Sequence, residues 1–277
     1  MKIMFNKQEI INYIESRHQK DGGYFFADIE PSSGADTFYA VKILKMLGVK
    51  PQNPEKIQKF FQEMDADKTI NDIKGLYFIL EVLKDLGFNL DHYQHYEGIL
   101  NQNKNKQGGF GLTGKIYIEV ASELQTTYEA IIVAKNLNFK LHRQTLKKFI
   151  FSFQNKDGGF GSYGFSLLAT TYYALASLDE LGLLKYNNKI SVYLRIKEEK
   201  LPGFYLEDLF WLVMSRALLG EKPRNMKEIV SFIYDCWRQD NGGFCRSRNI
   251  GISTFEDTYY ATTILKVLEE NNLTLFN

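Results

Sequence analysis

The chain has 277 residues and a formal net charge of +1, and its 34 basic and 33 acidic residues do not form blocks. This pattern argues against the strong positive field typical of nucleic-acid-binding proteins, so we expect no nucleic-acid partner. No stretch approaches the ~20 consecutive apolar residues of a membrane-spanning helix. The two cysteines, Cys236 and Cys245, are too few for a disulfide framework and fit a reducing compartment. We therefore expect a cytoplasmic protein without a membrane span.

Two short signatures recur along the chain. The first is Gly-Gly followed by an aromatic residue, at 22–24, 108–110, 158–160 and 242–244. The second follows roughly a dozen or more residues later and contains a threonine, in ADTFYA (35–40), QTTYEA (125–130), ATTYYA (169–174) and EDTYYA (256–261). Weaker copies at 73–87 and 201–220 keep one glycine, the aromatic residue and the helical pattern. The chain thus contains six units, each of about 40 to 50 residues, a period typical of repeat architectures.

Each unit is predicted to contain two helices. Before the glycines, apolar residues recur at helical spacing, as in Ile10 and Ile14, which indicates an amphipathic helix. After them comes a less charged helix that often ends in Leu-Gly. The Gly-Gly pair lets the backbone turn through positive φ angles without a Cβ penalty. Twelve helices in six hairpins predict an all-α fold, an α/α toroid that forms a single domain over residues 1–277. An open helical solenoid is the alternative.

The segment KDGGFGSYGFSLLATTYYALASLDELG (156–182) resembles the repeat shared by protein prenyltransferase β subunits and class II terpene cyclases, the prenyltransferase/squalene-cyclase repeat family. The resemblance implies a toroid whose inner helices surround an aromatic-lined cavity that holds an isoprenoid. The matching substrate-binding positions hold Tyr39, Tyr128, Tyr172, Tyr173, Trp211, Tyr259 and Tyr260, with Phe38, Tyr77, Phe78 and Phe210 beside them. Aromatic faces pack a prenyl chain and attract a developing carbocation. The alternative is that about half of these residues only fill the core.

The resemblance also implies a catalytic zinc in prenyltransferases, but the positions of its ligands hold other residues. The Asp-x-Cys pair falls on Leu167 and Ala169, or on Leu206 and Asp208. The histidine falls on Asp257, or on a tyrosine in a register shifted by a few residues. We therefore expect no zinc site of the family type. Cys245 directly follows a Gly-Gly-Phe signature and is the thiol expected to approach the cavity, whereas Cys236 is expected in the core.

Carboxylates stand at comparable helix starts in units one, five and six, which are consecutive in a closed ring: Asp36, Glu207, Asp208, Glu256 and Asp257. Crowded carboxylates raise one another's pKa values or recruit a cation. One chemistry makes Glu256 or Asp257 a general acid on an alkene, since TFEDT (254–258) resembles the Asp-x-Asp-Asp-Thr motif of class II terpene cyclases. The other holds Mg²⁺ for a diphosphate through Asp36, Asp208 and Asp257. A structural alternative is that Asp36 and Asp257 are N-caps.

Arginines follow the last Gly-Gly turn in GGFCRSRN (242–249). Arg246 and Arg248 match the place where the family binds a diphosphate, and guanidinium groups suit phosphate oxygens. Lys115 is a weaker candidate for the same role. A solvated basic loop is the alternative.

Three functions remain open from the sequence, and whether the chain is an enzyme is one of the open points. The first is a prenyltransferase-like enzyme that acts on a prenyl diphosphate without the usual zinc triad, and the resemblance implies that it pairs with a helical-repeat partner subunit. The second is a class II terpene cyclase-like enzyme. That class usually has a second helical domain, for which 277 residues leave no room. The third is a non-catalytic toroid that acts as a binding scaffold or lipid carrier.

Overall fold

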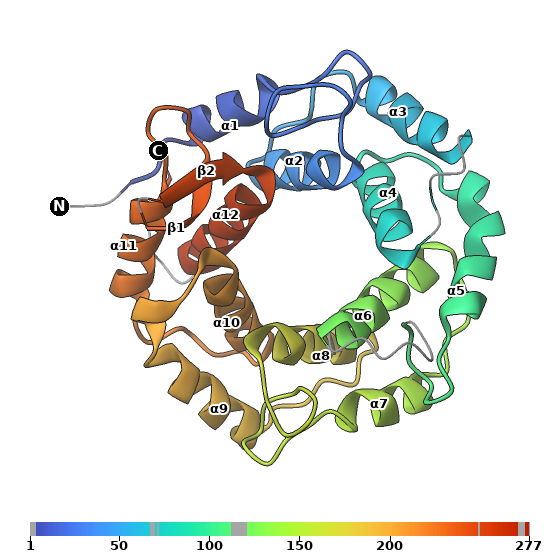
Figure 1. Ribbon diagram of the computed structural model, residues 1–277, viewed down its shortest axis with the longest axis vertical. Coiled ribbons are helices and arrows are strands. Elements are labelled where there is room, and N and C mark those ends of the chain that lie inside the picture. The colour runs from blue at the N-terminus through green and yellow to red at the C-terminus, as the bar shows by residue number, and fades with distance from the viewer. Residues whose placement is uncertain are drawn as a thin grey trace.

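The structure is a computed structural model that describes residues 4–66, 70, 72–111, 121–248, 250–270 and 275–276. Two concentric layers of helices form a ring (Figure 1). The inner helices are α2 (Gly34–Met46), α4 (Ile73–Asp85), α6 (Ala121–Asn136), α8 (Leu168–Glu180), α10 (Leu206–Leu218) and α12 (Phe255–Glu269). The outer helices are α1 (Lys7–Glu15), α3 (Pro54–Ala66), α5 (Glu97–Asn103), α7 (Arg143–Phe151), α9 (Asn188–Glu198) and α11 (Met226–Cys236). Two short 3₁₀ helices are also present: η1 (Asp91–Tyr96) lies between α4 and α5, and η2 (Leu201–Gly203) lies between α9 and α10.

The predicted toroid is confirmed, and the ring is closed. Each inner helix packs against the next, and α12 packs against α2, which an open solenoid does not allow. The two ends of the chain meet at this closure, where the backbone N–H of Phe5 donates to the carbonyl oxygen of Leu275 at 2.7 Å. Apolar side chains from both layers form one continuous cluster between them.

The recurring Gly-Gly turn has a packing reason. The first glycine of each pair has a positive φ angle, for example +95° at Gly158 and +84° at Gly242. A Cβ atom at Gly158 would lie closer than 3.0 Å to the carbonyl oxygen of Lys189, in the outer helix of the following unit. At Gly242 the same clash involves the carbonyl oxygen of Glu9 in α1. The last turn therefore packs against the first helix and closes the ring.

The recurring threonine also has a defined role. Its hydroxyl oxygen accepts a hydrogen bond from the backbone N–H of the aromatic residue that follows the glycines. The bond joins Tyr24 to Thr37 at 2.9 Å, and equivalent bonds are made by Thr127, Thr171 and Thr258. All four threonines are fully buried, so the bond satisfies a donor that would otherwise be orphaned in the core. The two signatures thus fix each turn to its own inner helix.

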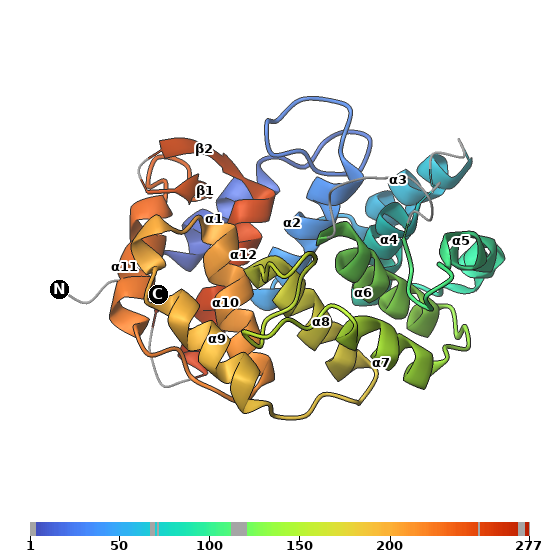
Figure 2. The ribbon, with the colours of Figure 1, turned by 60° about the horizontal axis from the view of Figure 1, so that its bottom comes forward.

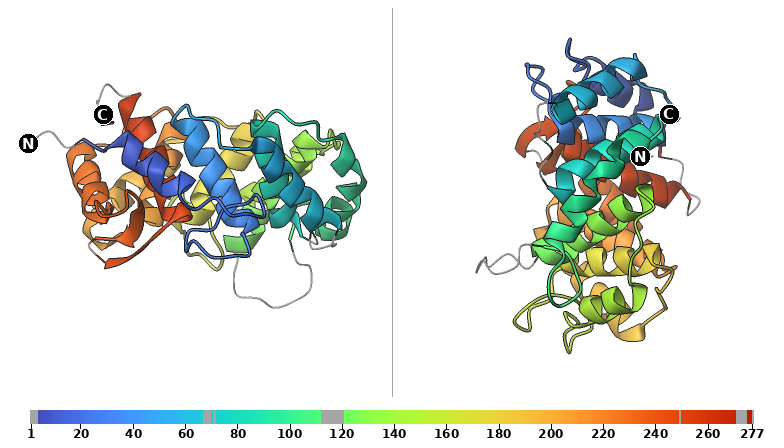
Figure 3. Two further views of the ribbon diagram at one scale, coloured as in Figure 1. Left: turned by 90° about the horizontal axis from the view of Figure 1, so that it is seen from above. Right: turned by 90° about the vertical axis from the view of Figure 1, so that its right-hand side faces the viewer.

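A small antiparallel hairpin was not predicted. Strands β1 (Phe244–Ser247) and β2 (Ile250–Thr254) pair with Phe244 opposite Thr254 and Cys245 opposite Ser253. The strands are too short to show an alternating pattern, and the segment RSRN (246–249) followed by Ile-Gly has the composition of a turn. The hairpin stands over the start of α12, and the loop that follows α1 stands over the start of α2 (Figure 2). Both lie on the same side of the ring, which we call the mouth (Figure 3).

Within the described residues, no helix is both long enough and apolar enough to cross a bilayer.

Candidate functional site

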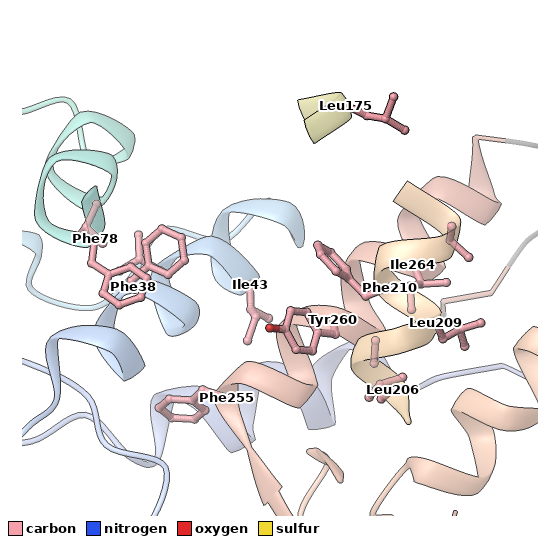
Figure 4. Packing of buried hydrophobic residues seen from close by; sticks show 14 of the residues in the cluster. Phe38, Ile43, Phe78, Leu175, Leu206, Leu209, Phe210, Phe255, Tyr260 and Ile264 are labelled. Atoms are coloured by element: carbon pink, nitrogen blue, oxygen red, sulfur yellow. The ribbon is translucent and has the colours of Figure 1, made fainter. Parts of the chain in front are cut away.

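Aromatic side chains line the centre of the ring at two successive positions after the repeat threonine. The first position holds Phe38, Tyr77, Tyr128, Tyr172, Phe210 and Tyr259, and the second holds Tyr39, Phe78, Glu129, Tyr173, Trp211 and Tyr260. Rings from neighbouring helices touch: the centroids of Phe38 and Phe78 are 4.7 Å apart, and those of Phe210 and Tyr260 are 4.6 Å apart (Figure 4). The centre is therefore a wall of contacting aromatic faces.

The cavity inside this wall is small. It is lined by Phe38, Tyr39, Lys74, Tyr77, Phe78, Gln125, Tyr128, Glu129, Tyr172, Tyr173, Phe210, Tyr259 and Tyr260. Its free volume of about 60 Å³ holds a few water molecules. Pockets for drug-sized ligands measure ~300–1,000 Å³. Six of the seven predicted substrate-binding aromatics line the cavity; the exception is Trp211, which is half-buried against the core instead. In this conformation the aromatic side chains themselves fill most of the centre.

Glu129 is a cavity residue that sequence reasoning missed. It stands on α6 at a position where each of the other five inner helices carries an aromatic residue, which is Trp211 in α10. Its carboxylate is only 5% exposed and accepts a hydrogen bond from Gln125 at 2.9 Å. Burial raises its pKa to about 7, although the Gln125 bond and the positive charge of Lys74 oppose the shift. The signal was present in QTTYEA, where an acid replaces the second aromatic of the motif.

The predicted acids share one position in their helices. Asp36, Asp208 and Asp257 are each the third residue of an inner helix. The prediction that Asp36 and Asp257 are N-caps is wrong, because Ser33 and Thr254 fill that role and accept hydrogen bonds from the backbone N–H groups of the two aspartates. The carboxylates are therefore not needed for capping.

Asp36 and Asp257 hold protons more tightly than ordinary carboxyl groups. Burial raises the pKa of each to about 6, and the negative charge of Glu256 adds to both shifts. Glu207 adds further to the shift of Asp257, while a hydrogen bond from Thr254 opposes it. The sequence-based expectation that crowding perturbs these acids is met, with desolvation as the larger cause.

Glu256 connects this acid group to the cavity wall. Its Oε1 atom accepts hydrogen bonds from the hydroxyls of Tyr39, at 2.7 Å, and Tyr260, at 2.8 Å. Tyr39 belongs to α2 and Tyr260 to α12, so the carboxylate bridges the first and last inner helices. Both tyrosines line the cavity, whereas the backbone of Glu256 lies at the mouth. A proton on this carboxylate would stand between solvent and the aromatic wall.

Asp208 does not join the other acids. Its Oδ2 atom accepts the backbone N–H of Tyr205 at 3.1 Å and so completes the start of α10. In the part of the chain that the structure describes, no three His, Cys, Asp or Glu side chains gather as a metal-binding group. The geometry thus does not assemble Asp36, Asp208 and Asp257 into the predicted magnesium site.

The side chains present do not fit the zinc site of the family. Cys245 is fully buried and does not reach the cavity, contrary to the expectation from its position in the sequence. Its thiol lies 3.2 Å from the carbonyl oxygen of Cys236 and 3.1 Å from that of Ser247, both of which accept from it. Cys236 is buried in the core as expected. Among the described residues, neither thiol belongs to a group of three His, Cys, Asp or Glu side chains that could hold a metal ion.

The two predicted diphosphate-binding arginines diverge. Arg246 lies at the mouth, where it forms an ion pair with Glu207 and stacks 4.5 Å from the centre of the Tyr205 ring. Arg248 instead faces the outer helix α11, 3.7 Å from the carboxylate of Asp235. Only Arg246 is close enough to the acid group to lower the pKa of Asp257. Lys115 lies outside the described residues.

Comparison with known proteins places the chain among toroids of this type. The sequence profile of the prenyltransferase alpha-alpha toroid domain matches residues 3–200 and 184–277. No curated protein sequence matches the chain.

Solved structures of two kinds share the fold. Protein geranylgeranyltransferase-I of Candida albicans, complexed with GGPP, is 15% identical, with a TM-score of 0.70 over 98% of this chain and 93% of its own. A variant of the type II terpene cyclase MstE from Scytonema, in complex with geranylgeranyl dihydroxybenzoate, is 13% identical, with a TM-score of 0.59 over 97% of both chains. The second match bears on the expectation that 277 residues are too few for a type II cyclase. This chain covers 97% of that cyclase chain with a single toroid, so the length does not count against the cyclase alternative.

Proposed function

The chain belongs to the prenyltransferase α/α-toroid family, and from this premise we propose that it is an enzyme that binds an isoprenoid in the central cavity and protonates one of its alkenes. The observation that carries the proposal is the bridge from Glu256 to Tyr39 and Tyr260. It joins an acid at the mouth to the aromatic wall. In TFEDT (254–258), Glu256 also stands where the cyclase motif Asp-x-Asp-Asp-Thr has its middle Asp.

The proton has a supply beside this bridge. Asp36 and Asp257 have pKa values of about 6, so part of each carboxyl population is protonated at neutral pH. The negative charge of Glu256 contributes to both raised pKa values. In the proposed step, the alkene electron pair forms a new C–H bond with the acid proton, and the acid is left as a carboxylate. The positive charge moves to the neighbouring carbon, where tyrosine and phenylalanine faces stabilise it. A second alkene of the isoprenoid then attacks this cation and closes a ring, and loss of a proton from the resulting cation to the carboxylate restores an alkene and regenerates the acid.

The cavity must widen for this to happen. Its free volume of about 60 Å³ is well below that of a pocket for a ligand of this size. Apart from the buried Tyr260, the tyrosines of the wall are half-buried. Among the described side chains, the hydroxyls of Tyr39 and Tyr260 are held by Glu256 alone. Loss of these two bonds leaves the rings free to rotate as the isoprenoid enters.

The test is product analysis with geranylgeraniol and geranylgeranyl diphosphate as substrates. We expect the wild type to form a cyclised product and Glu256→Gln to lose the activity, because the amide holds the same space without an acidic proton. Glu55→Gln is the matched control, since Glu55 is the second residue of outer helix α3 as Glu256 is of inner helix α12. Equal product from Glu256→Gln and the wild type would contradict the assignment.

A second candidate is transfer of a prenyl group from its diphosphate. Arg246 favours it, because this guanidinium lies at the mouth beside the acid group. Thermal unfolding with geranylgeranyl diphosphate and Mg²⁺ tests it. If the diphosphate binds there, the ligand raises the unfolding midpoint of the wild type and of Arg248→Ala, whose side chain faces α11, but not that of Arg246→Ala. Absence of any shift counts against this candidate.

We also propose a cytoplasmic location. It is supported by the two cysteines, which are both free and buried.

A further inference from the structure

A second, larger cleft lies away from the central cavity, where the first and last units of the ring meet. Its walls come from two parts of the chain that are distant in sequence: Tyr13, Arg17, Phe26 and Ala27, and Arg238, Asp240, Asn241, Gly251, Ile252 and Ser253. We call it the seam cleft. Its volume is about 580 Å³, within the ~300–1,000 Å³ range of small-molecule sites. Wall residues come from the loop after α1 and from the β1–β2 hairpin, which are neighbours in the ring (Figure 1) and both lie on the mouth side (Figure 3).

Arg17 is held rigidly on one wall. Its Nε atom donates to the carbonyl oxygen of Phe26 and its Nη1 atom to that of Tyr13, both at 2.9 Å. The guanidinium also stacks on the ring of Tyr13, with its central carbon 4.1 Å from the ring centre. All of these contacts are with neutral groups, so they fix the position of the side chain and leave its charge uncompensated.

Arg238 lines the same cleft from the last unit of the ring and is held by one hydrogen bond. Its Nη2 atom donates to the carbonyl oxygen of Gly251 at 2.8 Å. Among the described residues neither Arg17 nor Arg238 has a carboxylate within 4.0 Å, whereas Arg216, Arg246 and Arg248 each form an ion pair. Asp240 stands at the lip of the cleft with an exposed carboxylate. The Nη1 atom of Arg17 also donates to the Oγ atom of Ser16 at 2.9 Å, so its free N–H donors are those of Nη2. Two half-buried guanidiniums that lack an ion-pair partner among the described residues, each with free N–H donors, favour an oxyanion.

The remaining walls define the rest of the ligand. The Oδ1 atom of Asn241 accepts from the backbone N–H of Gly243 at 2.9 Å and from the hydroxyl of Ser253 at 3.1 Å, so the donors it can offer are its amide N–H groups. Phe26 and Ile252 add apolar surface, and Ile252 is 70% exposed. Donors on the walls and apolar surface at the edge suit an anionic head attached to an apolar body.

We propose that the seam cleft binds an oxyanion, a phosphate or carboxylate carried on an apolar group, between Arg17 and Arg238. The site is separate from the central cavity and does not depend on the function proposed for it. Because the walls come from units one and six, the bound anion ties the two ends of the ring together. Occupation of the cleft therefore stabilises ring closure.

Calorimetric titration of the purified chain with n-hexyl phosphate, hexanoate and inorganic phosphate tests the proposal. We expect hexyl phosphate or hexanoate to bind more tightly than inorganic phosphate, and their comparison distinguishes a phosphate site from a carboxylate site. Arg238→Gln should weaken binding at least about tenfold, the effect of losing one charged hydrogen-bonding group. Arg248→Gln makes the same charge change at the outer face and should leave the affinity unchanged.

A second variant tests the site independently if Arg238→Gln does not fold. Asp240→Asn removes an exposed negative charge at the lip and should tighten binding about two- to threefold at low salt. Hydrogen exchange should show that the ligand protects segments 13–27 and 238–253 together. Equal affinity in Arg238→Gln and the wild type overturns the proposal, as does no binding of any probe at millimolar concentration.

Discussion

Glu129 shows how one residue can change the chemistry of a repeated position. Every other inner helix places an aromatic ring there, and α6 places a carboxylate that is 5% exposed. Among the residues that line the cavity, Glu129 and Lys74 carry the charged side chains. A carboxyl group with a pKa of about 7 changes charge near neutral pH, so the polarity of the cavity depends on pH.

This shift has a consequence for stability. The pKa of Glu129 is raised from 4.5 to about 7 on folding, so between these values the folded chain binds more protons than the unfolded chain. Its contribution is therefore present at low pH and is lost as the pH rises through about 7. Asp36 and Asp257, with pKa values of about 6, act in the same direction.

Glu129→Gln should reduce the fall in the free energy of unfolding between pH 5 and pH 8 by about 1–3 kcal/mol, because the amide does not ionise. Urea unfolding at the two pH values measures the change. Glu55→Gln, at an exposed position of α3, should keep the wild-type dependence. A dependence in Glu129→Gln as steep as in the wild type would show that Glu129 is not perturbed.

The Gly-Gly turns control how the helices pack, because each turn sets the distance between one hairpin and the next. Gly242 combines a φ of +84° with a position against the carbonyl oxygen of Glu9. A side chain there meets both a backbone penalty and a clash with α1. The same pair of constraints recurs at Gly22 and Gly158, against Lys56 and Lys189.

Gly242→Ala should lower the free energy of unfolding by about 2–4 kcal/mol, the sum of the left-handed backbone cost and the displacement of α1. Gly98→Ala is the matched control: Gly98 lies within α5 and a Cβ there meets no atom within 4 Å. That variant should be neutral or stabilising by up to about 1 kcal/mol. Chemical denaturation of both variants gives the comparison, and equal effects would remove the proposed role of the turn.

The elements that could be predicted from the sequence are those that repeat. Gly-Gly turns, Leu-Gly helix ends and the shared threonine occur several times, so chance resemblance is small and the ring follows. The β1–β2 hairpin occurs once and is short, so its pattern is indistinguishable from a turn. The N-caps were misplaced by three residues, because Asp is itself a good cap and only geometry shows that Ser33 and Thr254 take that role.

Across the whole molecule, the sequence placed Asp36, Glu256 and Asp257 near one another, but it also grouped Asp208 with them and did not show what each side chain faces. Closure of the ring brings Asp36 near Glu256, although 220 positions separate them in the chain. Arg246 lies in β1, whose register is irregular between Cys245 and Ser247, and Arg248 directly follows the strand; Arg246 faces the mouth and Arg248 the outer layer. The seam cleft was also beyond prediction, since it exists only where the first and last units meet.

The most direct measurement of the central claim is the mass of the product formed from geranylgeraniol or its diphosphate in D₂O. If an acid protonates the alkene, the product carries solvent deuterium in a newly formed C–H bond, and the Glu256→Gln variant yields no such product. Release of diphosphate with an unlabelled product would contradict protonation and favour prenyl transfer. Unchanged substrate in every reaction would contradict the enzymatic account and leave a toroid that only binds.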